Sequence, residues 1–190
     1  MKKGSRSVPF YSLIMLLNGA VAVMFGIVSI PPPIPMAVPD SPPVVARVVP
    51  AISGTPERIV ISSLGIDLSV ETGSYNPRTG GWTLSADKAY YADMSVPAND
   101  SNGVTLIYGH AQAQVFARLS ALTPGTRVAV YTDNHRVFHY QYRSVKDVAP
   151  TDTSVFVASG PPTLVLQTCT GAWDAYRAMY SFAFVSEAQA

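Results

Sequence analysis

Aromatic and polar residues alternate most clearly between residues 136 and 143. Phe138, Tyr140 and Tyr142 occupy every second position of this segment, and a period of two is typical of a β-strand with one buried face. An apolar run at residues 127–131 precedes it, and a turn-forming pair at residues 133–134 separates the two. The pattern therefore predicts a hairpin in this part of the chain.

Shorter apolar runs, each bounded by glycine, proline or polar turn residues, predict the other strands. They lie at residues 58–61, 66–70, 104–108, 163–168 and 177–185. Residues 114–122 instead have apolar residues at helical spacing and predict a short helix of two turns. We expect a loop at residues 74–81 and a less regular segment at 82–97. Seven or eight short strands with little helix predict an all-β fold, either a β-sandwich or a closed barrel.

The N-terminal segment differs from the rest of the chain. Residues 8–30 are an uncharged run of 23 residues, which is long enough for a transmembrane helix. The basic residues lie before it, so the positive-inside rule predicts a cytoplasmic tail at residues 1–7 and an extracellular domain. A cleaved signal peptide is the alternative, because residues 20–22 resemble a cleavage site, but the apolar run continues beyond them. Both alternatives export the same domain.

A proline-rich segment follows the apolar run. Nine prolines fall between residues 31 and 56, and proline at this density favours extended polyproline II structure. We therefore expect a semi-rigid stalk at residues 31–55, with a disordered spacer as the alternative. Residues 56–190 then form the exported domain.

Composition limits the possible chemistry. The net charge of the 190-residue chain is +1 and no run of Lys or Arg follows Arg6, so we expect no nucleic-acid binding. The single cysteine rules out an internal disulfide and a zinc site of several thiolates. The acidic residues do not follow a calcium-loop pattern. We expect neither a metal nor a cofactor.

Three residues at the ends of predicted strands could act together. Cys169 follows the strand at residues 163–168, His110 follows the strand at 104–108, and Arg177 begins the last strand. A cysteine nucleophile needs a base or a positive charge nearby, which His110 could supply. Arg177 offers fixed donors for an oxyanion. Taken singly, each residue has an ordinary explanation, because a lone cysteine is often a small buried hydrophobe and a strand-end His or Arg is often solvated.

The order of these residues resembles the sortase family of cysteine transpeptidases. That family has a strand ending in Gly-His, then a Leu-X-Thr-Cys strand end, then an arginine on the next strand. The matching positions here are Gly109-His110, Leu166-Gln167-Thr168-Cys169 and Arg177. The resemblance covers about residues 56–185 and includes the opening strands at 57–66 and the segment at 116–128.

The resemblance implies a closed sortase-like β-barrel of seven or eight strands, tethered to the cell membrane of a Gram-positive-type cell. Such an enzyme cleaves a sorting signal of the Leu-Pro-X-Thr-Gly type in exported proteins. Cys169 would attack the Thr–Gly carbonyl and form an acyl-thioester, while His110 protonates the departing amine. Arg177 would hold the substrate and the oxyanion. The thioester would then pass to an amine of a lipid-linked peptidoglycan precursor or of a pilin lysine.

Two further positions are expected at the substrate site. The resemblance places Thr168 there, although it could equally be a plain strand residue. Trp173 lies between Cys169 and Arg177 in the chain, and we expect it to line the cleft unless it belongs to the core or the rim.

Other functions fit the motifs less well. In L,D-transpeptidases the cysteine usually follows Ser-His-Gly, and in papain-like hydrolases the cysteine precedes the histidine in the chain. Here His110 comes before Cys169. A non-catalytic, membrane-tethered β-domain that binds an envelope component is the remaining alternative. The enzyme interpretation requires His110 and Arg177 to approach Cys169 in one groove.

Overall fold

The computed structural model describes residues 50–79 and 81–190. The expected cytoplasmic tail, transmembrane helix and nearly all of the stalk lie outside this range. Within the described residues, no helix is both long enough and apolar enough to span a bilayer.

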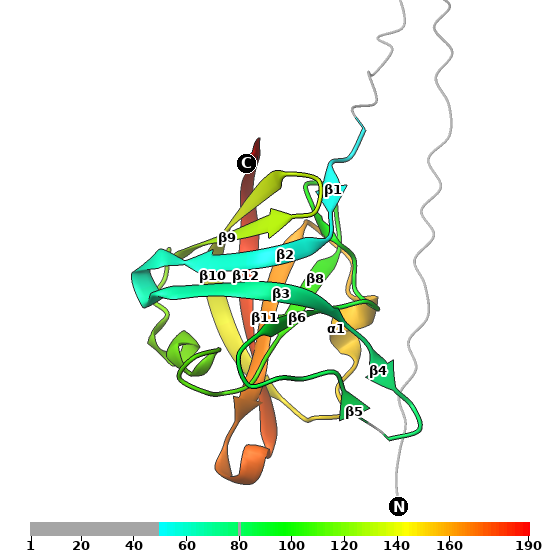
Figure 1. The fold of residues 1–190 in the computed structure, drawn as a ribbon, viewed down its shortest axis with the longest axis vertical. Helices are drawn as coiled ribbons and strands as arrows, with labels where there is room; N and C mark the ends of the chain where they lie inside the picture. Colours follow the sequence, from blue (N-terminus) through cyan, green and yellow to red (C-terminus); the bar gives the residue numbers. More distant parts are fainter. Residues whose placement is uncertain (1–49, 80) are drawn as a thin grey trace, which may run out of the picture. The chain divides into compact units, whose positions relative to one another are not determined.

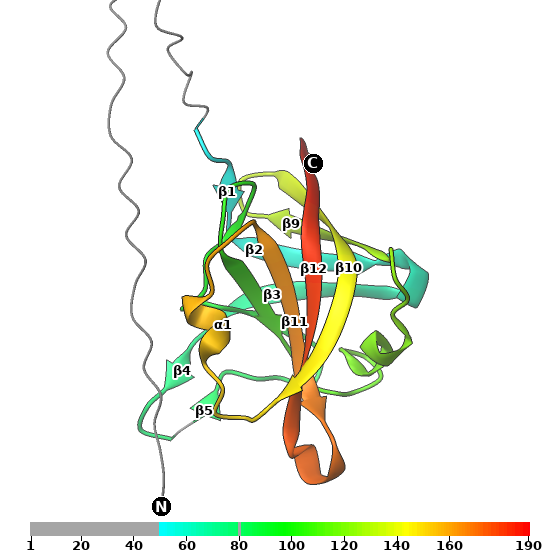
Figure 2. The ribbon, with the colours of Figure 1, turned by 180° about the vertical axis from the view of Figure 1, so that it is seen from behind.

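Eight strands close into a barrel in the order β10-β12-β11-β8-β6-β3-β2-β9 (Figures 1 and 2). Closure selects the barrel over the sandwich that the strand pattern also allowed. Two neighbouring pairs, β3–β6 and β8–β11, are parallel, and the other pairs are antiparallel. The barrel strands are β2 (Pro56–Ile61), β3 (Ile66–Gly73), β6 (Ala89–Ala92), β8 (Val104–Tyr108), β9 (Arg127–Thr132), β10 (Arg136–Val148), β11 (Thr163–Thr170) and β12 (Tyr176–Gln189).

The main core fills the inside of the barrel. The predicted alternation on β10 is confirmed, because Phe138, Tyr140 and Tyr142 are all buried in this core. Leu164 and Leu166 of β11, the second strand from β10 around the barrel, also belong to this core. Inward and outward side chains alternate along every barrel strand, so apolar residues at every second position close the interior.

A second, smaller core lies on the outer face of β6, β8, β11 and β12. It contains Leu106, Tyr108, Val165 and Met179, which alternate with the inward-facing residues of the same strands. Two short segments cover it. They are the β4–β5 hairpin (Tyr75–Asn76 and Gly81–Trp82) and the loop that carries helix α1 (Ser154–Val157), which contribute Trp82, Val155 and Phe156 to the packing.

The helix predicted at residues 114–122 is shorter and of a different type. It is a 3-10 helix, η2, at Ala117–Ala121. Leu119 N donates to Phe116 O at 3.1 Å, a hydrogen bond across three residues rather than four. The tight turn lets Val115, Phe116 and Leu119 all be fully buried. Packing against the barrel therefore overrides the two-turn helix that the spacing suggested.

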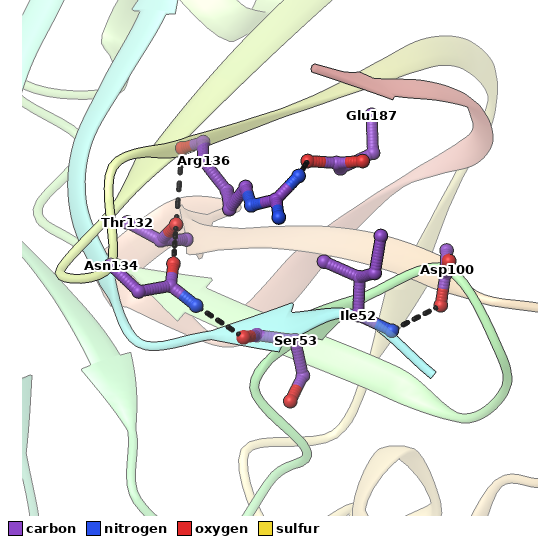
Figure 3. A network of polar contacts seen from close by, with 7 residues as sticks. All are labelled: Ile52, Ser53, Asp100, Thr132, Asn134, Arg136 and Glu187. Carbon is purple, nitrogen blue, oxygen red and sulfur yellow. Dashed lines mark hydrogen bonds and ion pairs between the residues drawn. The ribbon is translucent and has the colours of Figure 1, made fainter. Parts of the chain in front are cut away.

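The end of the barrel where the chain enters is fixed by a polar network (Figure 3). The short strand β1 (Ser53–Gly54) pairs with β7 (Ala98–Asn99). The Asn134 side-chain amide donates to the Ser53 carbonyl at 2.7 Å, and Thr132 Oγ1 donates to Asn134 Oδ1 at 2.8 Å. Strand β1 and the C-terminus lie near this end, whereas the β11–β12 connection lies at the opposite end (Figures 1 and 2).

Candidate active site

Three neighbouring strands bring the predicted catalytic residues to one end of the barrel. In the antiparallel pair β11–β12, Cys169 lies directly opposite Arg177. In the parallel pair β8–β11, Tyr108 lies beside Gln167, so His110 leaves β8 at the level where β11 reaches Cys169. Because β11 is the middle strand of the three, the cysteine lies between the histidine segment and the arginine.

Two hydrogen bonds fix the turn that carries His110. The Gly109 amide donates to the Gln167 carbonyl at 3.1 Å. The Thr168 hydroxyl donates to the Gly109 carbonyl at 2.9 Å. A Cβ at Gly109 would lie 2.7 Å from Val115 Cγ1, which explains why the chain needs glycine there. The Gly-His pair is thus a packed turn tied to the strand of Cys169.

The predicted catalytic residues share one pocket of about 290 Å³. Cys169 is half-buried, so its side chain is neither sealed in the core nor fully solvated. This is the groove that the enzyme interpretation required. Its lining includes Trp82, His110, Gln167, Thr168, Cys169 and Arg177.

Burial and two charges act on the thiol of Cys169. Burial, the largest effect, raises its pKa, because the low-dielectric surroundings disfavour the thiolate. The positive charge of Arg177 lowers the pKa and the negative charge of Asp174 raises it. The net result is a pKa above the ordinary value, so the resting side chain is the neutral thiol at neutral pH.

Arg177 is held by the loop between β11 and β12. Its Nη1 donates to the carbonyls of Asp174, at 2.9 Å, and Tyr176, at 3.1 Å. Within residues 50–79 and 81–190, its Nε and Nη2 atoms make no hydrogen bond. The guanidinium is therefore oriented by one nitrogen, and its other donors remain for a ligand in the pocket.

Thr168 is 5% exposed and lies in the pocket wall. Its hydrogen is already donated to the Gly109 carbonyl, so in this conformation the hydroxyl can accept a hydrogen bond from a substrate but cannot donate one. Its predicted substrate-binding role stays a prediction, and the observed contact is one that positions the turn before His110.

Trp173 is not brought to the pocket. It is 99% exposed, in the loop between β11 and β12, and is not among the residues that line the cavity. Trp173 and Asp174 both have positive φ, at 58° and 57°. This left-handed backbone conformation directs the Trp173 side chain away from the pocket. Its assignment as a substrate-binding residue stays a prediction that this conformation does not support.

Trp82 and Gln167 are among the cavity-lining residues that sequence reasoning missed. Trp82 begins the segment that was expected to be less regular but lies in β5, and its place on the barrel depends on long-range packing. Gln167 could have been predicted from the sequence, because it lies two residues before Cys169 and therefore shares the outward face of β11 with Val165 and Cys169.

The arrangement supplies a nucleophilic thiol, an imidazole and a guanidinium around one space. This set fits acyl transfer, in which the thiol attacks a carbonyl, the imidazole moves protons and the guanidinium neutralises the oxyanion. Among the described residues, no group of three His, Cys, Asp or Glu side chains could hold a metal ion.

Comparisons with known proteins agree with this chemistry. A family model described as the Sortase domain matches residues 59–186. The search of curated proteins gave no match.

Solved structures of similar fold include three that each cover about 70% of the chain. Sortase E1 from Streptomyces coelicolor, which holds a tripeptide in its active site, has a TM-score of 0.56 and 19% identity over 72% of this chain and 91% of that one. Sortase C1 from Streptococcus suis has a TM-score of 0.57 and 16% identity, covering 70% and 74%. A lid mutant of sortase A from Corynebacterium diphtheriae has a TM-score of 0.56 and 19% identity, covering 74% of each chain. At these identities the likeness concerns the fold.

Proposed function

Because the chain belongs to the sortase family of cysteine transpeptidases, we propose that it cleaves a C-terminal sorting signal of the Leu-Pro-X-Thr-Gly type and joins the exported protein to an amine. The observation that carries the proposal is the single pocket that brings His110, Cys169 and Arg177 together. The family match favours catalysis over a non-catalytic binding domain.

In the first half-reaction, Cys169 Sγ attacks the carbonyl carbon of the Thr–Gly bond. Because burial keeps the resting thiol protonated, its proton must leave during the attack, and His110 is the base in the pocket that can take it. The free donors of Arg177 stabilise the oxyanion. The C–N bond then breaks, the proton passes from His110 to the glycine amine, and an acyl-thioester remains on Cys169.

In the second half-reaction, an acceptor amine attacks the thioester carbonyl. His110 removes a proton from that amine as the new C–N bond forms. The C–S bond breaks, and the proton returns to Cys169 Sγ. The amine comes from a lipid-linked peptidoglycan precursor or from a pilin lysine, and the enzyme and its protein substrate are unchanged in oxidation state.

The proposed site of action is the outer surface of a Gram-positive-type cell membrane. The support is the uncharged run at residues 8–30 and the basic residues before it. The N-terminus is then cytoplasmic and the catalytic domain extracellular. A peptide substrate is also supported by sortase E1 from Streptomyces coelicolor, whose active site holds a tripeptide.

The test uses the purified full chain in detergent, a quenched library of Leu-Pro-X-Thr-Gly peptides and an added amine. We expect the wild type to release the glycine fragment and form the amide product, and the Cys169→Ala variant to do neither. His110→Ala should lower the rate about 10²–10⁴-fold, the usual range for general acid–base catalysis. Cleavage that survives in Cys169→Ala, or a wild type inert toward the entire library, would overturn the proposal.

A further inference from the structure

Trp82 joins the two segments that cover the outer face of the barrel. It lies on the β4–β5 hairpin and packs against the outer core. Its ring stacks on Phe156 of α1 with centroids 5.8 Å apart and planes 13° apart. It also meets Tyr108 edge-on at 5.2 Å and Tyr75 at 5.5 Å. The indole is therefore fixed by aromatic neighbours on three sides, which makes it a rigid wall rather than a mobile side chain.

Trp82 borders three adjoining hollows. One is the Cys169 pocket. The second is a groove of about 570 Å³ that runs from this pocket past Met94 and Pro150, and the third is a narrow recess of about 60 Å³. Gln167 and Arg177 border all three as well. A peptide whose carbonyl lies at Cys169 can thus continue over Gln167 and along Trp82 without leaving the cavity.

The groove is suited to apolar, uncharged side chains. Arg177, at its junction with the Cys169 pocket, is the single charged residue in its lining within the described part of the chain. Aromatic and apolar groups form most of the remaining wall, including Tyr75, Met94 and Phe156. Ligand sites of this kind bind apolar groups and use a few polar ones to fix orientation. Gln167, whose side chain can both donate and accept, is suited to hydrogen bonds with a peptide backbone.

We propose that Trp82 is a specificity-determining residue of the transpeptidase. Its indole contacts an apolar side chain of the peptide on the N-terminal side of the scissile bond and limits the size of that side chain. This inference rests on the proposed function, because it concerns the same pocket and the same substrate. Trp82 lines both the recess of about 60 Å³ and the wider groove, so its indole limits the space that is open to that side chain.

Changing Trp82 should alter selectivity and leave the chemistry at Cys169 intact. Trp82→Ala should lower kcat/KM for the preferred peptide about tenfold, the size expected for losing part of an apolar contact. Peptides with an aromatic residue at the contacted position should lose less or gain, because the recess and the groove merge. Trp82→Phe should give intermediate selectivity. Arg78→Ala, on the same hairpin and outside the lining of these hollows, is the matched control and should keep the wild-type profile.

A binding experiment tests the contact without requiring turnover. The chain has two tryptophans, Trp82 and Trp173, so the full chain carrying Trp173→Phe and Cys169→Ala reports on Trp82 fluorescence alone. Titration with the library peptides should shift the emission of Trp82, and more strongly for peptides with an aliphatic residue than for those with a charged residue upstream of threonine.

The selectivity experiment and the fluorescence titration together distinguish the role of Trp82 from the proposed transpeptidase reaction. A Trp82 emission that no peptide changes, or a Trp82→Ala variant whose selectivity profile equals that of the wild type, overturns the role of Trp82 even if the wild type is an active transpeptidase. Failure of the wild type to cleave, with a Trp82 signal that responds to peptide, overturns the proposed reaction and leaves the contact standing. If Trp82→Ala does not fold, Trp82→Phe and Phe156→Leu give the selectivity comparison.

Discussion

The hydroxyl of Thr168 provides a sharp test of how the site is assembled. It donates to the Gly109 carbonyl at 2.9 Å from a nearly buried position, and Gly109 is the residue before His110. Thr168→Val replaces the hydroxyl with a methyl group of similar size. The substitution therefore removes one hydrogen bond and leaves the strand otherwise intact.

The expected magnitude follows from what the Gly109 carbonyl loses. A net hydrogen bond contributes about 1 kcal/mol, and a buried acceptor left without a partner costs roughly 1–3 kcal/mol. We expect Thr168→Val to lower the free energy of unfolding by about 1–3 kcal/mol. For a domain of this size that corresponds to roughly 2–4 °C in Tm for each kcal/mol. Activity should fall further, because displacing a catalytic group by about 1 Å can cost on the order of 10²-fold in rate.

The assay combines urea unfolding with steady-state transpeptidation. A positioning role lowers kcat more than it raises KM, because His110 acts in the chemical step. Thr168→Ser keeps the hydroxyl and should recover most of the stability and most of kcat. If Thr168→Val equals the wild type in both measurements, the bond does not position His110. If Thr168→Ser fails as badly as Thr168→Val, the methyl group rather than the hydroxyl matters.

Three further predictions follow from the same structure. The rate of alkylation of Cys169 should rise with pH with a midpoint above about 8.5, the ordinary thiol pKa. Arg177→Gln should raise that midpoint and Asp174→Asn should lower it, because the positive charge favours the thiolate and the negative charge disfavours it. Shifts of the opposite sign would refute these charge effects on Cys169. Tyr108→Phe should leave the free energy of unfolding unchanged or raise it by about 1 kcal/mol in urea titrations, because the Tyr108 hydroxyl is buried and has no hydrogen-bond partner within the part of the chain that the structure describes; a clear loss would show that the hydroxyl has a partner. Phe182→Ala should cost about 3–5 kcal/mol in the same titrations, because Phe182 is fully buried in the barrel core, and a cost below about 1 kcal/mol would mean that the core relaxes around the gap.

The barrel was predictable where one face of a strand is buried. Alternation on β10 and the apolar runs of β8, β11 and β12 identified the strands that carry the site. Strand β6 was missed because all four of its residues are buried: Tyr91 faces the inner core and Tyr90 the outer one. A strand that is buried on both faces shows no alternation of apolar and polar residues. The outer face of β6 becomes buried only when the β4–β5 hairpin and the α1 loop fold over the barrel.

The site was predictable where its residues end neighbouring strands. His110, Cys169 and Arg177 converge because β8, β11 and β12 are adjacent, which the sequence motifs indicated. The position of Trp82 could not be read locally, because its neighbours Tyr108 and Phe156 are distant in the chain. Trp173 was expected in the cleft, but consecutive left-handed residues in its loop turn it outward, and no local pattern marks a tryptophan for that conformation.

The most direct measurement is the intact mass of the full chain after incubation with a Leu-Pro-X-Thr-Gly peptide in the absence of an acceptor amine, quenched in acid. We expect an added mass equal to that of the peptide up to and including threonine, less one water, located on Cys169 by peptide mapping and released by an added amine. Cys169→Ala should show no adduct. An adduct on another residue, or one that persists in Cys169→Ala, would contradict the acyl-thioester mechanism.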